Sequence, residues 1–183
     1  VTMNNSMNYV ATPRLGFSEA VKRVLNNLTN VNGRARRSEY WWFVFATTIV
    51  NGIFCSIFGS TSIIYAVVSI LVSLCTVAVG VRRLHDSGHN AIWVYIGFVS
   101  SIIVLVYIHA TGFFELTNTL NPNPEKIFET LSSPVYAVSA SVSFICGLVV
   151  FIFSLFDSNM GPNKYGDSPK YIPADSQDQT ASL

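Results

Sequence analysis

An uncharged stretch from Tyr40 to Val81 constrains the fold of this chain more than any other feature of its sequence. The stretch is about twice as long as the roughly 20 residues that one helix needs to cross the hydrocarbon core of a bilayer. Gly59 to Ser62 interrupt it with small, turn-forming residues. We therefore predict two membrane spans, residues 41–59 and 62–81, that fold back on each other as a hairpin.

Two further apolar runs follow in the sequence. Residues 91–114 are interrupted only by His109, and residues 135–156 carry no charge. Runs of this length satisfy their backbone polar groups inside a bilayer by forming helices. The predicted fold class is an all-α integral membrane protein, in which residues 41–156 form four transmembrane helices in two hairpins. Composition agrees, because 11% of the residues are charged, whereas an average soluble protein has about 25%.

Basic residues gather on one side of these spans. The connections between spans one and two and between spans three and four contain only Lys126. The other basic residues are Arg14, Lys22, Arg23, Arg34, Arg36, Arg37, Arg82, Arg83, Lys164 and Lys170. By the positive-inside rule we expect both termini to lie in the cytoplasm. The net charge of only +1 gives no reason to expect a nucleic-acid partner.

The cytoplasmic N-terminal segment, residues 1–40, contains an amphipathic helix over about residues 17–28. Its apolar side chains recur on one face at helical spacing, and we expect Ser18 to cap its first turn. We expect the helix to lie in the headgroup region of the membrane, with its apolar face toward the lipid. The alternative is that it packs against a helix of a partner protein. The apolar face comprises Phe17, Val21, Val24, Leu25 and Leu28.

Two other segments lie outside the spans. Residues 115–134 predict a short surface helix, because Asn123 suits the capping position and Pro124 suits the first helical position. Residues 157–183 form a tail that is cytoplasmic in the predicted orientation. From about residue 167 this tail is rich in Ser, Asp, Gln and Pro and lacks apolar periodicity, so we expect it to be flexible from there.

The interiors of the spans contain few polar groups, and none has Asp, Glu, Lys or Arg in its core. We interpret Asn51 as a residue that forms a hydrogen bond between helices, and His109 as an interfacial histidine. Small residues recur at helical spacing, which indicates a helix-packing interface. A hydroxyl-lined conduit is the alternative interpretation. The small residues are Gly52, Ser56, Ser60, Ser69, Ser73, Ser139, Ser143 and Gly147.

The densest polar cluster, Arg82 to Asn90, does not form a recognisable catalytic site. His85, Asp86 and His89 are metal-ligating residue types, but one short cluster is weak evidence, and Gly88 disturbs the helical spacing that a shared site needs. We therefore expect no metal, no cofactor and no enzymatic activity. A membrane-embedded enzyme that uses His85 and Asp86 is the weakest alternative.

Three short motifs in order resemble a known family. The first resembles Gly-Arg-x-x-Arg-x-Glu-Tyr-Trp, the second Arg-Arg-Leu-His-Asp and the third Gly-x-Asn-x-Tyr-Gly. Here they are Gly33, Arg34, Arg37, Glu39, Tyr40 and Trp41; Arg82, Arg83, Leu84, His85 and Asp86; and Gly161, Asn163, Tyr165 and Gly166. The chain thus resembles the domain of unknown function 805 family of small bacterial inner-membrane proteins. Where that family often has Gly-Trp-Trp before the third span, this chain has Ala91, Ile92 and Trp93. The resemblance implies a multi-pass protein of the bacterial inner (cytoplasmic) membrane, but no activity.

All three motifs fall on the same side of the membrane in the predicted orientation. We expect Glu39 to pair with Arg82 or Arg83, because an acidic residue gains nothing from an anionic surface. We also expect the turn from Asn163 to Tyr165 to fold under the bundle and to close a polar cap. The candidate cap residues, which are also candidate lipid or partner contacts, are Arg34, Arg37, Glu39, Arg82, Arg83, His85, Asp86, Asn163 and Tyr165. The candidate membrane-interface anchors are Tyr40, Trp41, Trp42 and Trp93.

These residues favour a non-enzymatic membrane protein whose cytoplasmic cap binds anionic phospholipid headgroups or a partner protein. Its partners are then the lipid bilayer and either a second copy of the chain, in a homo-oligomer, or another membrane protein. The alternative is a small-solute or ion transporter or channel that acts as an oligomer. Such a pathway would need polar groups inside the membrane, and the residues that best fit this need are Asn51 and His109.

Overall fold

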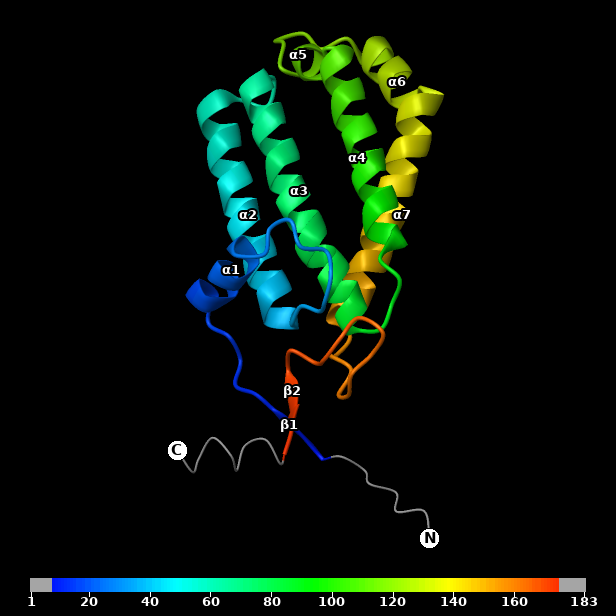
Figure 1. Ribbon diagram of the computed structural model, residues 1–183. Coiled ribbons are helices and arrows are strands. Elements are labelled where there is room, and N and C mark those ends of the chain that lie inside the picture. The colour runs from blue at the N-terminus through cyan, green and yellow to red at the C-terminus, as the bar shows by residue number, and fades with distance from the viewer. Residues whose placement is uncertain (1–7, 175–183) are drawn as a thin grey trace.

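The computed structural model describes residues 8–174 of the chain (Figure 1). The described part is mostly helical and has one small two-stranded sheet, which corrects the expected all-α fold. In chain order the elements are β1 (Tyr9–Ala11), α1 (Phe17–Leu25), α2 (Arg37–Phe58), α3 (Ile63–Asp86), α4 (Ile92–Ala110), α5 (Phe113–Thr117), α6 (Pro124–Ser132), α7 (Pro134–Leu155) and β2 (Tyr171–Pro173).

Within the described residues, α2, α3, α4 and α7 are the helices long and apolar enough to cross a membrane, which confirms the predicted number of spans. Two of them end at residues other than those predicted. α3 continues past Val81 to Asp86, because the polar side chains of its last turn find partners inside the protein. α4 ends at Ala110, since Gly112 follows with φ 63°, a left-handed conformation that glycine adopts without steric cost.

The four long helices pack as two pairs, α2 with α3 and α4 with α7 (Figure 1). The pairs come together at the end where α2 and α4 begin and α3 and α7 finish, and they diverge toward the opposite end, where α5 and α6 lie. Buried apolar side chains concentrate at the first end, in clusters that include Phe43, Val79, Leu84 and Val94. Farther along the helices many large apolar side chains are exposed, as lipid-facing surfaces require.

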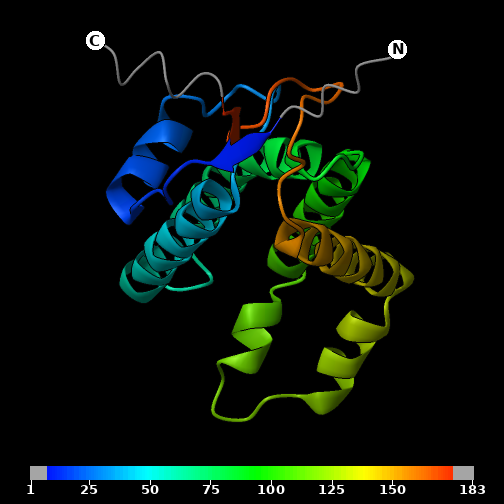
Figure 2. The same cartoon turned by 90° about the horizontal axis from the view of Figure 1, so that it is seen from below.

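Three segments from distant parts of the sequence gather at the end where the pairs meet, and together we call them the cap: residues 8–36, 82–91 and 156–174. Seen along the bundle, α1 lies beside α2 on the side away from α7, and the sheet and the last described residues cross over the helix ends (Figure 2). The cap therefore brings together the sequence neighbourhoods of all three motifs.

Helix α1 packs against the protein's own α2, a contact that the amphipathic pattern alone did not predict. Val24 is fully buried in this contact, whereas Phe17 and Leu25 of the same apolar face stay exposed. The N-cap residue is Gly16, and it makes no side-chain capping hydrogen bond, so the prediction that Ser18 caps the helix is wrong. Only part of the apolar face is thus left for the headgroup region.

The C-terminal tail is ordered beyond the residue where we expected flexibility to begin. β1 and β2 pair antiparallel, with Val10 opposite Ile172. Thr12 extends the pairing, because its backbone N and its Oγ1 both donate to the carbonyl of Lys170, at 2.8 and 3.0 Å. Tyr171–Pro173 therefore form a strand within the segment for which the sequence predicts flexibility. Residues 175–183 lie outside the described residues.

Helix packing does not follow the predicted stripes of small residues. A Cβ added at Gly52 or Gly147 would meet nothing within 4 Å, so the packing interpretation is wrong at these two positions. The close approach of α4 and α7 lies instead at Gly97, where an added Cβ would be 3.0 Å from the Cβ of Cys146.

The connection from α4 to α7 forms the end of the bundle opposite the cap. As predicted, Asn123 caps the short helix α6, and its side chain accepts hydrogen bonds from the backbone N of Glu125 and of Lys126 at 3.0 and 3.3 Å. His109, near the end of α4, donates from Nδ1 to the carbonyl of Leu105 at 3.0 Å.

Candidate functional site

The carboxylate of Asp86, at the last residue of α3, is the centre of the cap. It is fully buried and meets two arginines: Nε of Arg34 lies 3.0 Å from Oδ1, and Nη1 of Arg83 contacts Oδ2. Oγ of Ser158 donates a further hydrogen bond to Oδ2. We call these four residues the Asp86 cluster. Two cations share one carboxylate, so the cluster depends on additional acceptors to stabilise the second positive charge.

The guanidinium of Arg34 finds these acceptors in the tail. Beside its bond to the carboxylate, it donates to the main-chain carbonyls of Asp86, Asn159, Gly161 and Gly166, at 3.3, 2.6, 2.9 and 3.2 Å. A guanidinium has five N–H donors, and here each has an oxygen partner. Arg34 therefore has no donor left for a lipid headgroup, which corrects its predicted role as a lipid contact.

Arg83, near the end of α3, also donates to main-chain carbonyls, and these belong to the residues before α2 and to the end of α7. Its side chain is fully buried and donates to the carbonyls of Ala35, Ser154 and Phe156 as well as to Asp86. Ala35 precedes α2, and the other two carbonyls belong to the end of α7. Arg83 is thus a structural residue that holds the two helix pairs together at the cap.

The turn of the third motif lies against the second motif, as the sequence predicts. The ring of His85 stacks on that of Tyr165, with centroids 3.6 Å apart. Nδ2 of Asn163 donates to the carbonyl of His85 at 2.9 Å, while its Oδ1 accepts from the backbone N of Tyr165 at 2.8 Å. His89 stacks separately on Phe153. Accordingly, no three His, Cys, Asp or Glu side chains within residues 8–174 lie together in a way that could hold a metal ion.

Glu39 does not have the expected partner. It is buried, and its Oε1 lies 3.9 Å from Nη1 of Arg23 on α1. Arg82 donates instead to the carbonyls of Ala78 and Asn27, and Arg83 is occupied by Asp86. The predicted pairing of Glu39 with Arg83 is therefore wrong. Glu39 makes no close ion pair with Arg82 either, although the charges of these two side chains interact. Glu39 meets Arg23 because α1 packs on α2, and this packing brings Arg23 to the carboxylate of Glu39.

A second group of cations surrounds a cleft of about 450 Å³ where α2 begins. We call it the basic cleft. Its charged lining residues are Arg14, Arg36, Arg37 and Lys170. Its other lining residues are Leu15, Ser38, Trp41 and Trp42. Arg37 was a predicted cap residue and the two tryptophans were predicted anchors. Arg14, Arg36 and Lys170 were not predicted, because only the fold places residues 14 and 170 beside the start of α2.

Arg36 is the buried member of the basic cleft. It is 5% exposed, and within the described residues its guanidinium donates one hydrogen bond, from Nη2 to the carbonyl of Thr12 at 2.9 Å. Burial lowers the pKa of Arg36 below its ordinary value, an effect that the charge of Glu39 opposes. In contrast to Arg34, this arginine has donors to spare and lines an open space.

Asp157 lies between two cations of the basic cleft. Its Oδ1 is 3.2 Å from Nη2 of Arg37, and its Oδ2 is 2.6 Å from Nζ of Lys170. Partial burial alone would raise the pKa of Asp157, but hydrogen bonds from Lys170 and from the backbone of Ser158, with the charge of Arg37, lower it to about 2. Hydrogen bonds to Asp157 and Tyr171 outweigh burial and raise the pKa of Lys170.

Removing Lys170 is expected to raise the pKa of Asp157 toward its ordinary value. In Lys170→Met, the pKa of Asp157 should rise from about 2 toward the ordinary value of roughly 3.9, and remain below it because Arg37 is retained. The stabilisation from a depressed carboxyl pKa is present above the unfolded value and is lost as the pH falls through the folded value. In the native protein it should therefore disappear between about pH 4 and pH 2.

The measurement is the carboxyl ¹³C shift of labelled aspartate, followed by NMR. Lys164→Met is the matched control, since Lys164 lies over the ring of Tyr165 rather than beside Asp157. An unchanged midpoint in Lys170→Met would contradict the assigned cause.

The predicted membrane anchors differ in position. Trp42 and Trp93 are exposed, as anchors must be, whereas Tyr40 is 9% exposed and belongs to the core at the cap, so its predicted role is wrong. Trp41 is half-buried, contacts the ring of Phe151 edge-on, and borders both the basic cleft and a second cavity.

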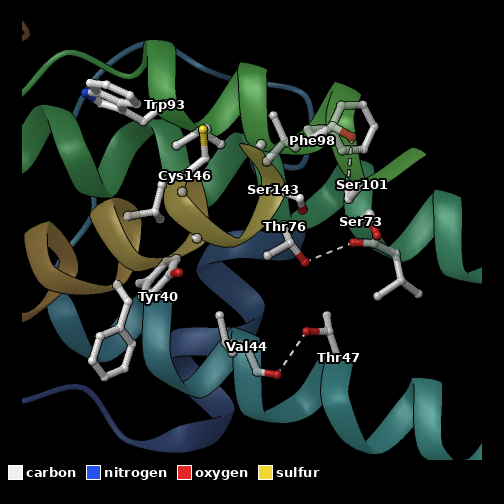
Figure 3. A pocket seen from close by; sticks show the side chains of 18 of the residues that line it. Tyr40, Val44, Thr47, Ser73, Thr76, Trp93, Phe98, Ser101, Ser143 and Cys146 are labelled. Atoms are coloured by element: carbon white, nitrogen blue, oxygen red, sulfur yellow. Dashed lines mark hydrogen bonds between the residues drawn. The ribbon is translucent and has the colours of Figure 1, made fainter. Parts of the chain in front are cut away.

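The second cavity lies between the four long helices and has a volume of about 460 Å³ (Figure 3). We call it the interhelical cavity. Side chains of all four helices line it, among them Tyr40, Thr47, Thr76, Ser101 and Ser143, which point toward a common space in the close view. Asn51 also lines it, but bonds the carbonyl of Thr47 in its own helix, so no interhelical hydrogen bond of the predicted kind is seen.

Comparison with known proteins gives consistent matches. Residues 28–167 match the family described as "Protein of unknown function (DUF805)". Inner membrane protein YhaI of Escherichia coli is 32% identical over 96 residues, which cover 49% of this chain and 81% of that protein. Inner membrane protein YhaH of Escherichia coli is 35% identical over 114 residues, which cover 56% of this chain and 93% of that protein. No solved structure matches the chain.

Proposed function

The chain belongs to the DUF805 family, and from this membership and the geometry of the basic cleft we propose that it is a non-enzymatic protein that binds anionic phospholipid headgroups at its cap. It is a multi-pass protein of the bacterial inner membrane, as its relatives are and as its four long apolar helices require. The predicted orientation, with the cap in the cytoplasm, places the basic cleft at the inner leaflet, whose anionic lipids attract basic segments.

The observation that carries the proposal is the position of the basic cleft beside exposed aromatic residues. Phe17, Trp42 and Phe45 contact one another edge-on, with centroids 5.6 to 6.5 Å apart, and all three are substantially exposed. Trp42 also lines the basic cleft. Aromatic side chains of this kind settle at the boundary between headgroups and acyl chains. A phosphate in the basic cleft would therefore lie at the depth where phospholipids carry it.

Charge complementarity supports the same occupant. Four cations line the basic cleft, and Asp157, which contacts Arg37 and Lys170, offsets one of them. Within the described residues, Arg14 makes no ion pair, and Arg36 uses one of its five donors. Arginine side chains with free donors recognise phosphate oxygens well, since the guanidinium offers parallel N–H groups. The saturated arginines of the Asp86 cluster cannot take this role.

The test is the retention of phosphatidylglycerol against phosphatidylethanolamine, measured by native mass spectrometry on the protein purified with an equal mixture of both. We expect the native protein to retain phosphatidylglycerol preferentially. In Arg14→Gln with Lys170→Gln, the preference should fall by roughly 30-fold, because each basic residue near an anionic surface contributes about 1 kcal/mol and 1.4 kcal/mol is a factor of ten.

The matched control is Lys22→Gln with Lys164→Gln, which removes the same charge from the cap outside the basic cleft. This control should keep most of the preference. Equal retention of the two lipids by the native protein, or an equal loss in both double variants, would contradict the proposal. A protein that copurifies with the native chain and leaves with the cleft variant would identify a partner protein as the occupant instead.

A further inference from the structure

Most of the lining of the open interhelical cavity is apolar, but polar side chains gather at one level, where the surrounding bilayer should be most apolar. Along α2 the residues Tyr40 and Thr47 both line it, and seven residues of helix rise about 10 Å. Near the cap the lining is largely aromatic and apolar. About two turns farther into the bundle, every helix contributes a hydroxyl: α2 through Thr47, α3 through Ser73 and Thr76, α4 through Ser101 and α7 through Ser143.

The hydroxyls of this ring present mainly hydrogen-bond acceptors. Thr47 donates to the carbonyls of Phe43 and Val44, Thr76 to Val72 at 2.9 Å and Ser101 to Phe98 at 2.8 Å. Ser73 of the ring and the further lining residue Thr48 do the same, whereas Ser143 makes no such bond among the described residues. A backbone carbonyl can only accept, so each of these protons is committed to the helix. What remains for the cavity is the lone pairs of the oxygens.

Asn51 adds a group that is only partly satisfied. Its Nδ2 donates to the carbonyl of Thr47 at 3.0 Å, while a carboxamide offers a second N–H and two acceptor lone pairs. An amide at this depth in a membrane is costly unless it has partners. Since none of the lining residues is Asp, Glu, Lys or Arg, a charged molecule would find no counter-charge there.

We propose that the interhelical cavity binds a small uncharged molecule rich in hydrogen-bond donors, a polyol being the simplest chemical class. The cavity volume of about 460 Å³ lies within the roughly 300 to 1,000 Å³ of small-molecule sites. The O–H groups of the molecule donate hydrogen bonds to the ring of hydroxyl oxygens and to Asn51. Its carbon skeleton contacts the aromatic and apolar residues that line the cavity near the cap. A phospholipid chain would contact the apolar lining, but it would leave the ring of hydroxyl oxygens and the second N–H of Asn51 without hydrogen-bond partners. The site is independent of headgroup binding at the basic cleft.

The probe is glycerol, and the measurement is saturation-transfer NMR on the protein in nanodiscs. We expect transfer to glycerol above that of empty nanodiscs and none to 1,2,3-trimethoxypropane, which keeps the acceptors but lacks the donors. Thr47→Val with Thr76→Val removes two hydroxyls with little change of shape. Loss of two hydrogen bonds, at about 1 kcal/mol each, should weaken the binding of glycerol roughly 30-fold and reduce the signal accordingly.

Ser56→Ala with Ser69→Ala is the matched control, because these residues carry the same type of backbone-bonded hydroxyl on α2 and α3 but do not line the cavity. It should leave the signal unchanged. Both double variants should unfold at the temperature of the native protein, which separates loss of binding from loss of structure. Equal transfer to glycerol and to its ether, no transfer at all, or an unchanged signal in Thr47→Val with Thr76→Val would overturn the proposal.

Discussion

Asp86→Asn is expected to lower the free energy of unfolding by about 3 to 5 kcal/mol, the cost of removing one partner from a buried ion pair. The native carboxylate is fully buried and is shared by Arg34 and Arg83. Asparagine has nearly the same shape but no charge, so both guanidinium groups stay buried without a counter-ion. Because Arg83 also joins the ends of α3 and α7, the damage should spread to the contact between the helix pairs.

The measurement is unfolding in mixed micelles with increasing fractions of sodium dodecyl sulfate, followed by tryptophan fluorescence. Asp157→Asn is the matched control, because its carboxylate also contacts two cations but is half-exposed. An exposed pair contributes about 0 to 1 kcal/mol. If Asp86→Asn and Asp157→Asn unfold at the same detergent fraction, the Asp86 cluster does not hold the cap together.

Arg34→Lys is expected to release the tail from the bundle while keeping the charge. A lysine ammonium has three donors on one atom, whereas the guanidinium of Arg34 reaches five oxygens. Lysine can keep its ion pair with Asp86, but at least two of the four main-chain carbonyls that Arg34 bonds lose their donor, and at least one of these two lies in the tail. These bonds to the tail are partly buried, and each lost hydrogen bond costs about 0.5 to 1.5 kcal/mol.

Hydrogen exchange followed by mass spectrometry is the direct readout. Peptides covering residues 158–168 should lose protection in Arg34→Lys, while peptides from α2 to α4 should keep most of theirs. Arg37→Lys is the control, because Arg37 is half-exposed and makes one backbone hydrogen bond and one exposed ion pair. If residues 158–168 keep their full protection from hydrogen exchange in Arg34→Lys, the positive charge alone holds the tail, and the several N–H donors of the guanidinium are not needed.

The membrane architecture was predictable because each span is encoded locally. Uncharged runs of sufficient length predict the helices whatever their neighbours are, and the turn at Gly59 and the cap at Asn123 rest on residues adjacent in sequence. The meeting of His85 with Asn163 and Tyr165 was also predictable, because an even number of spans returns all three motifs to one end.

The pairing of charges within the cap was not predictable. Which carboxylate meets which cation depends on the packing of α1 on α2 and on the path of the tail, and neither leaves a periodic pattern in the sequence. Glu39 therefore makes its ion pair with Arg23, while Arg82 interacts with it only through its charge at longer range. The sequence also did not predict that all N–H donors of Arg34 are used, because three of the acceptors are carbonyls of the tail.

For a related reason the basic cleft was missed, and the interhelical cavity was foreseen only as the alternative of a hydroxyl-lined conduit. Arg14 and Lys170 are neighbours only because β1 and β2 pair. The ring of hydroxyls requires the relative height of four helices, which composition does not record. The spacing of Ser69 and Ser73 resembles a packing stripe, but only Ser73 lines the cavity.

The convergence of the helix pairs at the cap also has a mechanical consequence. The pairs are joined at the cap, where Arg83 of α3 donates to the carbonyl of Ser154 near the end of α7, and they diverge at the other end like two arms on a common pivot. An arm of 22 residues, the length of α2, is about 33 Å long. A tilt of about 5° at the pivot therefore moves its far end by about 3 Å at that length. Small rearrangements of the cap are thus amplified across the membrane, and the width of the space between the arms is set from one side only.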